Sequence, residues 1–414
     1  MEDWKEYKLK DFLLIPIRNG LTKPSAIRGQ GVKMIGMKEI FAMDRIRSVE
    51  MERVPVTDKE YESSNIREND LLFARQSLSL EGAGKCSIVL SVDEPTVFES
   101  HIIRLRIDKE KADPFFLYYY FKSSKGRNQV KSLVQQVAAA GIKGKELIEL
   151  PIIAPSLDYQ KKVTVLLKNI DDKIECNRQI NENLEQQAQA LFKSWFVDFE
   201  PFKDQPFVES ELGMIPQGWK VGIVKDLCVT NKRSYKGDFA KEIEYIDTGS
   251  VTNNVIDSVQ ILNPATDKIP SRARRAVMEG DIIYSSVRPN QRHYALLFNP
   301  SANTVVSTGF VVITANWSGY RYFIYQFLIQ DEFVDKLQAI AEQSVSTFPS
   351  LNASDITNLK IVIPPNDVVG DYASMCCSLF AKIYENQQES RRLVELRDTL
   401  LPKLMSGEIN VNNL

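Results

Sequence analysis

The sequence has few of the residues that common metal sites, disulfide frameworks and membrane segments depend on. It contains two histidines, His101 and His293, and five cysteines, none of which form a Cys-x-x-Cys pair. We therefore expect no zinc site and no disulfide framework, and the odd cysteine count is typical of reduced thiols inside a cell. No apolar run reaches 18 residues, and the N-terminal segment 1–5 contains three charged residues and no apolar signal core. We expect no membrane span, no signal segment and a cytoplasmic location.

The short motifs of common enzyme classes are also missing. The sequence has no GxxxxGK[ST] loop, no GxGxxG after a strand, no GxSxG and no HExxH. Asn263-Pro264 and Pro364-Pro365-Asn366 only approach the Asn-Pro-Pro-aromatic pattern of amino-methyltransferases. We therefore expect no catalytic residue, no metal ligand and no bound cofactor. A nuclease or methyltransferase acting by itself is the less favoured alternative.

The chain contains the same pattern twice, with a spacing of about 209 residues. Residues 173–177 (Lys-Ile-Glu-Cys-Asn) return as 382–386 (Lys-Ile-Tyr-Glu-Asn), and residues 68–73 (Glu-Asn-Asp-Leu-Leu-Phe) return as 279–284 (Glu-Gly-Asp-Ile-Ile-Tyr). Two copies of one unit are expected, each consisting of a globular part followed by a long helix.

The pattern within each copy predicts an α+β fold. Short apolar runs at 70–74, 87–90 and 102–105 predict strands, and Asp113-Pro114 is a good N-cap and first position for an aromatic helix. We predict globular domains at residues 1–155 and 219–365. Helical segments are predicted at 156–200 and 366–414. A linker rich in proline and glycine is predicted at 201–218.

The two helical segments carry matching apolar stripes. Residues 157–196 lack proline and glycine, and seam positions alternate by three and four residues, which is typical of a coiled coil. Forty helical residues would span roughly 60 Å. The predicted pairing residues are Ile170, Ile174, Asn177 and Leu184 in the first helix and Leu379, Ile383, Asn386 and Leu393 in the second. Arg397 interrupts the second stripe. A simple amphipathic helix on its own domain is the alternative for each stripe alone.

A pseudo-twofold relation between the copies would make the two helices antiparallel, with the C-terminus near the first domain. Asn177 and Asn386 occupy equivalent seam positions. A buried polar residue in a helix seam costs stability but fixes the register of the pair.

Basic and amide-rich loops occur at matched places in the two copies. Arginine with asparagine or glutamine can read guanine and adenine edges, and lysine suits phosphate. In the first copy the candidate DNA contacts are Lys23, Arg28, Lys33, Arg75, Gln76, Ser77, Lys85 and Lys143. In the second copy they are Lys232, Arg233, Tyr235, Lys236, Arg288, Asn290, Gln291, Arg292, Ser344 and Thr347. The alternative is that these are ordinary polar surface loops. Asp70 and Asp281 are better explained as turn residues ahead of buried strands.

Several segments resemble the DNA-specificity subunit of type I restriction–modification systems, and the resemblance covers essentially the whole chain. The most specific segments are 396–409 (Leu-Arg-Asp-Thr-Leu-Leu-Pro-Lys-Leu-Met-Ser-Gly-Glu-Ile) and 191–199 (Leu-Phe-Lys-Ser-Trp-Phe-Val-Asp-Phe). Residues 280–283, 307–310 and 213–219 are also similar to that family. The first copy departs from the pattern, with Asn69 in place of glycine and Ser100-His101 in place of Thr-Gly.

The resemblance implies two target-recognition domains that each read one half of a bipartite, asymmetric site in double-stranded DNA. It also implies that the two helices set the spacing and dock two methyltransferase subunits. S-adenosylmethionine is expected in those partners, and restriction subunits are expected to join through the complex. A structural, protein-tethering dumbbell without DNA readout remains as the alternative.

Large apolar side chains gather at the helix ends and indicate a docking surface for the methyltransferase. They are Phe192, Trp195, Phe196 and Phe199 in the first helix and Leu400, Leu401 and Leu404 in the second. Packing of each helix end against the neighbouring domain is the alternative.

Overall fold

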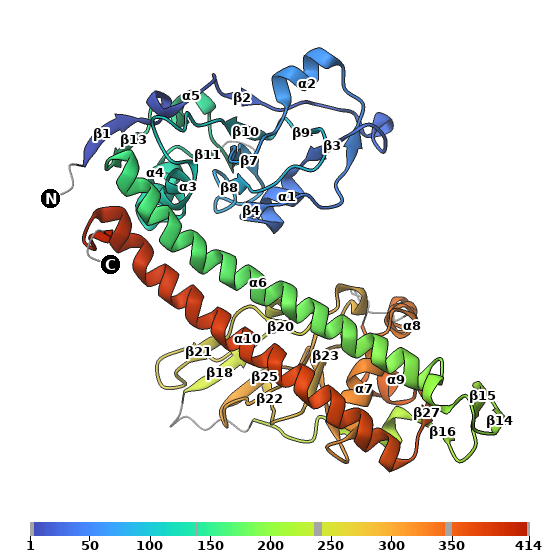
Figure 1. The fold of residues 1–414 in the computed structure, drawn as a ribbon. Coiled ribbons are helices and arrows are strands. Elements are labelled where there is room, and N and C mark those ends of the chain that lie inside the picture. The colour runs from blue at the N-terminus through green and yellow to red at the C-terminus, as the bar shows by residue number, and fades with distance from the viewer. Residues whose placement is uncertain (1–3, 137–139, 236–241, 344–349, 412–414) are drawn as a thin grey trace. The chain divides into compact units, whose positions relative to one another are not determined.

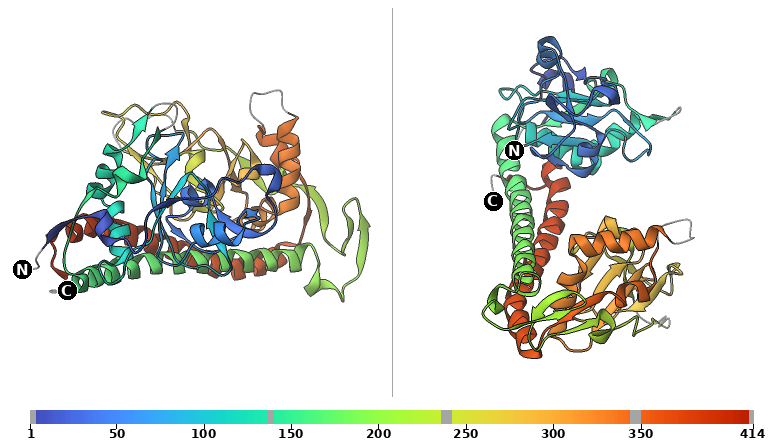
Figure 2. Two further views of the ribbon diagram at one scale, coloured as in Figure 1. Left: turned by 90° about the horizontal axis from the view of Figure 1, so that it is seen from above. Right: turned by 90° about the vertical axis from the view of Figure 1, so that its right-hand side faces the viewer.

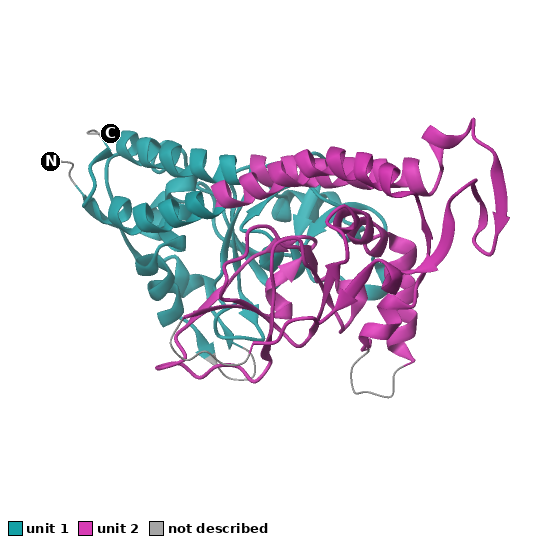
Figure 3. Ribbon diagram, turned by 90° about the horizontal axis from the view of Figure 1, so that it is seen from below, with its two compact units in different colours: residues 1–175, 391–414 teal, residues 176–390 magenta. Residues whose placement is uncertain are grey.

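The computed structural model describes residues 4–136, 140–235, 242–343 and 350–411 and divides into two compact units. Unit 1 comprises Met1–Glu175 and Arg391–Leu414, and unit 2 comprises Cys176–Ser390 (Figure 3). Each unit combines one copy of the duplicated sequence with a segment of each long helix. The predicted α+β class is confirmed. The division cuts both helices, so a separation of helical segments from globular domains stays a prediction.

Unit 1 contains small mixed sheets and short helices (Figure 1). Its strands are β1 (Lys5–Lys8), β2 (Arg18–Asn19), β3 (Val32–Ile35), β4 (Arg45–Ile46), β5 (Arg53–Val54), β6 (Leu71–Ala74), β7 (Gln76–Ser77), β8 (Cys86–Val89), β9 (Thr96–Phe98), β10 (Ile102–Leu105), β11 (Gln135–Gln136), β12 (Ala140–Gly141) and β13 (Pro151–Ala154). Its short α-helices are α1 (Met37–Ala42), α2 (Asp58–Ser64), α3 (Pro114–Lys122), α4 (Ser124–Ser132) and α5 (Gly144–Leu147).

The central sheet of unit 1 has the order β2-β10-β6-β8-β4, and two three-stranded sheets have the orders β5-β3-β9 and β11-β12-β7. Helix α3 begins as predicted, because the Asp113 carboxylate accepts the Phe116 N–H at 2.9 Å and Pro114 takes the first position. Every residue from Pro114 to Phe121 is buried. A helix that is apolar on all sides is stable only when it is enclosed by its own domain.

Unit 2 repeats this plan with different loops. Its strands are β14 (Phe207–Ser210), β15 (Gly213–Pro216), β16 (Lys220–Ile223), β17 (Cys228–Thr230), β18 (Ile243–Ile246), β19 (Val251–Thr252), β20 (Val255–Ile256), β21 (Gln260–Leu262), β22 (Ala273–Ala276), β23 (Ile282–Ser285), β24 (Tyr294–Leu296), β25 (Thr304–Ser307), β26 (Phe310–Ala315) and β27 (Lys360–Ile363). Its short α-helices are α7 (Tyr320–Leu328), α8 (Asp331–Glu342) and α9 (Ala353–Thr357).

The duplication of the sequence is visible in the strand pairing. Antiparallel strands β10-β6-β8 of unit 1 correspond to β26-β23-β24 of unit 2. The parallel pair β3-β9 corresponds to β18-β25, and the pair of first and last strands, β1-β13, corresponds to β16-β27. The two units therefore share a scaffold.

The turn before the central strand is also the same in both units. Asn69 (φ 70°) and Gly280 (φ 77°) are both left-handed. Asparagine tolerates this conformation better than most non-glycine residues, which explains how the first copy keeps the turn of the second copy without its glycine.

The aspartates that follow are structural. Asp70 accepts the Arg67 N–H at 2.8 Å and pairs with Arg106 at 2.7 Å. Asp281 accepts the Met278 N–H at 2.9 Å and pairs with Arg233. Both aspartates are almost fully buried. A buried charge needs a partner of this kind, so the interpretation as turn residues agrees with their environment.

Two long helices, α6 (Leu157–Phe196) and α10 (Asn366–Ser406), pass through both units. Within each unit the two helical segments run antiparallel and lie side by side (Figure 1, Figure 2). In unit 2, Asn177 donates to the Glu389 carboxylate at 2.8 Å and Asn386 donates to Asn181 at 2.8 Å. Both asparagines are buried, so they lie in the contact between the helices as the seam pattern predicted.

The other predicted seam residues are apolar, and they are less uniformly buried. Ile170 and Ile383 are buried, whereas Ile174, Leu184, Leu379 and Leu393 are half-buried. The contact between α6 and α10 therefore consists of an apolar stripe together with polar hydrogen bonds, and it is not apolar along its whole length.

Arg397, which interrupts the apolar stripe, has a specific partner in unit 1. Its guanidinium lies 2.9 Å from the carboxylate of Asp171 on α6, and the other oxygen of Asp171 accepts the Tyr119 hydroxyl at 2.7 Å. Asp171 is only 7% exposed. This buried carboxylate ties α6, α10 and α3 together.

Replacing Arg397 with methionine should therefore destabilise unit 1 by about 3 kcal/mol, because it leaves a buried carboxylate without its ion-pair partner. The measurement is the urea midpoint of the unfolding transition. Asp171→Asn combined with Arg397→Met should recover most of the loss, since asparagine is neutral and still accepts the Tyr119 hydroxyl. Arg392→Met on the exposed face of α10 is the matched control. An Arg397→Met midpoint equal to the control would contradict a structural role for the pair.

Candidate nucleic-acid interface

The candidate interface contains two equivalent loops that connect equivalent strands. Loop 1 (residues 75–85) connects β6 with β8 in unit 1, and loop 2 (residues 286–293) connects β23 with β24 in unit 2. In loop 1 the Arg75 N–H donates to the His101 carbonyl at 2.7 Å, and the Arg75 carbonyl accepts the Ile142 N–H at 2.9 Å. In loop 2 Ser286 makes the same two bonds, with Gly309 at 2.8 Å and Leu351 at 2.7 Å. The same backbone contacts thus anchor both loops.

Loop 2 has an unusual and well-supported backbone. Arg288 (φ 49°) and Arg292 (φ 55°) are left-handed and flank a single 3-10 turn over Pro289–Gln291. Such conformations are unfavourable for residues with side chains and persist only when neighbouring contacts hold them. The Arg292 guanidinium bonds to Asp331 of α8 at 2.5 Å, and the Asn290 N–H donates to the Gln338 side chain at 3.2 Å.

The side chains of Arg288, Asn290 and Gln291 are exposed on this rigid turn, whereas Arg292 is half-buried. Arginine and amide side chains at one exposed point form the donor and acceptor set that can read base edges. Arg292 instead supports the turn through α8.

A two-asparagine turn supports loop 2 from the side of the long helices. Asn253 (φ 46°) and Asn254 (φ 63°) connect β19 and β20. The Asn253 N–H donates to the Arg292 carbonyl at 2.9 Å, and its side chain accepts the Tyr294 hydroxyl at 3.2 Å. His293 also reaches this hairpin, since its Nδ1 lies 2.5 Å from the Val251 carbonyl.

Asn254 joins both long helices to β24 within unit 2. Its side-chain oxygen accepts the Leu296 N–H at 3.0 Å, and its amide donates to Glu185 of α6 at 3.3 Å. Its carbonyl accepts the Gln387 side chain of α10 at 2.8 Å. A continuous series of hydrogen bonds therefore leads from the helix pair through Asn254 and Asn253 to loop 2.

Glu185 is the titratable group of this network. Its carboxylate accepts the Tyr325 hydroxyl at 2.8 Å in addition to the Asn254 amide. Desolvation by the surrounding unit raises the pKa of the Glu185 carboxyl to about 7, although both hydrogen bonds favour the ionised form.

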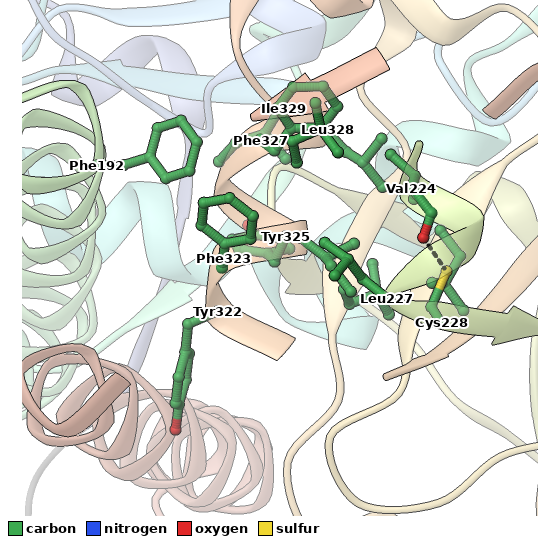
Figure 4. Packing of buried hydrophobic residues seen from close by; sticks show 14 of the residues in the cluster. Phe192, Val224, Leu227, Cys228, Tyr322, Phe323, Tyr325, Phe327, Leu328 and Ile329 are labelled. Carbon is green, nitrogen blue, oxygen red and sulfur yellow. Dashed lines mark hydrogen bonds between the residues drawn. The ribbon is translucent and has the colours of Figure 1, made fainter. Parts of the chain in front are cut away.

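Figure 4 shows the apolar packing beside this network. Phe192 of α6 and Phe323 of α7 have ring centroids 5.7 Å apart, and Tyr322 points toward α10. The buried Cys228 thiol lies 3.2 Å from the Val224 carbonyl. Burial raises the pKa of that thiol to about 12, which agrees with a structural cysteine.

Loop 1 places a second set of polar side chains at the edge of unit 1. Gln76 and Ser77 form β7 of the short sheet β11-β12-β7, where Gln76 is exposed and Ser77 is half-buried, and the preceding Arg75 is also half-buried. Lys143 is well exposed and lies 3.2 Å from Glu146. Lys85 is more enclosed, since its ammonium donates to the Phe41 carbonyl at 3.0 Å and lies 3.1 Å from Asp44.

Three further basic residues of the first copy have acidic partners within unit 1. Lys23 pairs with Glu60 at 2.8 Å, and Arg28 pairs with Glu52 at 2.7 Å. Lys33 is 5% exposed and pairs with Glu94 at 3.0 Å. These ion pairs give the three residues a structural role within unit 1 and leave them less suited to contact DNA.

The remaining candidates of the second copy differ from one another. Lys232 is exposed, whereas Tyr235 is half-buried against a small apolar cluster. Arg233 pairs with buried Asp281 and donates to Thr314 at 3.1 Å, so it supports the scaffold. Lys236, Ser344 and Thr347 lie outside the described residues.

The apolar residues proposed for docking lie mostly inside the cores of their own units. Phe192 and Phe196 are buried in unit 2, where Trp195 and Phe199 are half-buried among aromatic rings. Leu401 and Leu404 are buried in unit 1, and Leu400 packs against the same cluster. This arrangement corresponds to the alternative of packing against the neighbouring domain.

Sequence reasoning did not single out some residues that lie close to the loops. Arg272 and Arg274 are exposed, and the Arg272 carbonyl accepts the Thr308 N–H at 2.8 Å, beside the anchor of loop 2. The run Ser271-Arg272-Ala273-Arg274-Arg275 was a visible signal for a basic surface. His101 of unit 1, which differs from the expected Thr-Gly pattern, is exposed, and its carbonyl accepts the Arg75 N–H at 2.7 Å at the anchor of loop 1.

Among the described residues, no helix has the length and apolar character that a membrane span requires. In the same part of the chain, no three histidine, cysteine, aspartate or glutamate side chains are grouped so that they could hold a metal ion.

Comparison with known proteins gives consistent matches along the chain. The family model described as "Type I restriction modification DNA specificity domain" matches residues 1–186 and 216–368. The MjaIX specificity subunit of a type I restriction enzyme from Methanocaldococcus jannaschii is 29% identical to this chain. The match covers 100% of this chain and 95% of that protein. The HindI specificity subunit from Haemophilus influenzae is 23% identical, with 99% of this chain and 100% of that protein covered.

A solved structure shares the fold. The type I restriction–modification S subunit from M. genitalium matches with a TM-score of 0.57 and 14% identity, over 97% of this chain and 96% of that one.

Glu185 should make the stability of unit 2 depend on pH. Its pKa is raised in the folded state, so the folded protein binds this proton more tightly than the unfolded chain does. Stability from this group is complete below the unfolded pKa of about 4.5, falls as the pH rises, and levels off above about 7. The loss should approach about 3 kcal/mol at most.

The measurement is urea unfolding at pH 5 and pH 8. Glu185→Gln should be more stable than the wild type at pH 8 and should lose less stability between the two pH values. Glu182→Gln, an exposed position one turn earlier on α6, is the matched control. Equal pH dependence in the wild type and Glu185→Gln would show that the carboxyl is not desolvated.

Proposed function

Because the chain belongs to the type I restriction modification DNA specificity family, we propose that each unit reads one half of a bipartite, asymmetric site in duplex DNA. The chain is a specificity subunit, a non-catalytic part of such a system that recognises DNA target sites.

The observation that carries the proposal is the contrast between loops 1 and 2. Equivalent backbone bonds at Arg75 and Ser286 anchor both loops on equivalent strands, whereas their exposed side chains differ. A shared scaffold with different exposed side chains suits the reading of two different half-sites. A protein-tethering dumbbell would not require this difference.

Specific roles follow from exposure and chemistry. We assign base reading in unit 2 to Arg288, Asn290 and Gln291, and in unit 1 to Arg75 and Gln76 with Ser77. Lys143, Lys232 and the exposed Arg272 suit phosphate contact. Arg292, Arg233 and Lys85 support the loops from within their units.

The long helices complete the proposal. They would set the distance between the half-sites and dock two methyltransferase subunits, which would bind S-adenosylmethionine, with restriction subunits joining through the complex in the cytoplasm. The partially exposed apolar side chains Val165, Ile180, Met375 and Leu396 on α6 and α10 are candidates for that docking.

Arg288→Ala and Lys232→Ala should have different effects on DNA binding. If Arg288 contacts guanine through two hydrogen bonds, its loss should relax discrimination at one or two positions of one half-site, at a cost of about 1–3 kcal/mol. A lost phosphate contact at Lys232 should weaken binding to all sequences and lower the salt slope by about one unit.

The measurements are methylation mapping in cells and binding at several salt concentrations in vitro. Arg321→Ala, whose side chain pairs with Glu279 away from the loop anchors, serves as an arginine control. Loss of discrimination in both half-sites from Arg288→Ala would contradict the division between units.

The helices can be tested as a ruler by inserting seven residues into both α6 and α10, after Glu175 and after Ser390, where the compact units divide. Seven helical residues add roughly 10 Å, which corresponds to about three base pairs at roughly 3.4 Å each. The gap in the methylated motif should lengthen accordingly. A functional double insertion with an unchanged gap would show that the helices do not set the spacing.

A further inference from the structure

Loop 1 ends in an apolar tip that the polar side chains of its stem do not explain. Leu78 is 104% exposed and Leu80 is 51% exposed. Phe41 of α1 is 43% exposed, and its ring lies 3.0 Å from the point where a Cβ on Gly82 would be. Burial of a fully exposed leucine side chain is favourable by roughly 2 kcal/mol of free energy, so contact with a complementary apolar partner would stabilise the complex.

The tip is held in a defined shape by serine hydroxyls. The Ser77 hydroxyl accepts the Ser79 N–H at 3.1 Å, and the Ser79 hydroxyl accepts the Gly82 N–H at 3.1 Å. The Arg127 guanidinium donates to the Glu81 carbonyl on the same turn. These bonds close residues 77–82 into a compact turn that presents Leu78 to solvent.

The position of the tip indicates what it contacts. Loop 1 is the counterpart of loop 2, where the exposed side chains are Arg288, Asn290 and Gln291. If loop 2 reads base edges, the equivalent position in unit 1 faces the other half-site. Leu78 stands there one residue after the polar stem of Arg75, Gln76 and Ser77.

The charge on the tip favours the base edges over the phosphates. Glu81 is exposed in the same turn, and a carboxylate is repelled by the phosphate backbone. Among the groups that base pairs display in the major groove, the C5-methyl of thymine is the apolar one.

We propose that Leu78, supported by Leu80, recognises a thymine methyl group in the half-site that unit 1 reads. This inference rests on the proposed function and adds an apolar contact to the polar contacts of Arg75 and Gln76. It predicts that unit 1 distinguishes thymine from deoxyuridine, which differ only by that methyl group.

The test is binding of the full chain to duplexes that carry deoxyuridine in place of each thymine of the mapped target, one at a time. The methyltransferase subunit is included in every assay if DNA binding requires it. The half-site read by unit 2 is identified with Arg288→Ala. For the wild type, one substitution in the other half-site should weaken binding about 3- to 5-fold, the effect of losing one buried methyl group.

In the Leu78→Ala variant, deoxyuridine at that position should have little effect on DNA binding, because the side chain that contacts the methyl group is gone. Leu78 is fully exposed, so this variant should fold normally. Leu14→Ala, at a 55% exposed position of unit 1, is the matched control and should keep the full sensitivity to deoxyuridine. Substitutions in the half-site of unit 2 should affect the wild type and both variants equally.

The outcomes separate this inference from the proposed function. Specific binding by the wild type with equal sensitivity to deoxyuridine in Leu78→Ala would overturn the thymine contact and leave the function intact. A variant that loses methyltransferase subunits while its sensitivity to deoxyuridine is unchanged would assign the tip to a protein partner and overturn the contact as well. Absence of any sequence preference in the wild type would overturn the proposed function and this inference together.

Discussion

The antiparallel pairing of α6 and α10 is the contact on which each compact unit depends. The core of unit 1 contains Leu401, Leu404 and Met405 from the end of α10, although the rest of that core comes from the first copy of the sequence. The core of unit 2 contains Phe192 and Phe196 from the end of α6. Each copy therefore completes its core with a helix that belongs to the other copy in sequence. Neither copy of the sequence contains its whole unit.

This exchange explains why large apolar side chains gather at the helix ends. From sequence alone, Trp195 and Phe196 exceed what one helix seam can bury, which suggests an external partner. In unit 2 they pack instead against Tyr372 of α10, with ring centroids 6.1 and 4.9 Å away, and Phe196 also packs against Phe323 of α7. A helix seam involves only one neighbouring helix, whereas α6, α7 and α10 all meet at this point.

Polar contacts then determine how the helices are aligned. A purely apolar stripe tolerates a shift by one heptad, because leucine and isoleucine pack similarly at each step. Buried polar groups do not tolerate it, since each loses a specific partner. Asn177, Asn386 and the pair of Asp171 with Arg397 have such partners, and Glu185 extends the contact through Asn254 to loop 2. The alignment of the helices and the position of a candidate reading loop are thus linked within unit 2.

The sequence was informative wherever a feature depended on local pattern or on the duplication. The helix cap at Asp113, the turn at Asn69 and Gly280, and the long antiparallel helices all followed from it. It was less informative about charged side chains, because their surroundings depend on residues far away in sequence. Lys33 pairs with Glu94, and Arg233 pairs with Asp281, because strand pairing brings these distant parts of the sequence together. Arg397 looked like an interruption because its partner Asp171 lies on the other helix.

The two loops show why recognition can vary while the scaffold stays constant. Their anchors at Arg75 and Ser286 are bonds between backbone groups, and backbone bonds of this kind are available to any residue except proline at a donor position. The exposed side chains beyond the anchors contribute little to folding, so they can change without loss of the unit. In loop 2 the turn is strained and is supported by Asp331 and Asn253, whereas in loop 1 it is closed by its own serine hydroxyls. The two loops therefore present two different chemical surfaces on one scaffold, as the proposed reading of two different half-sites would require.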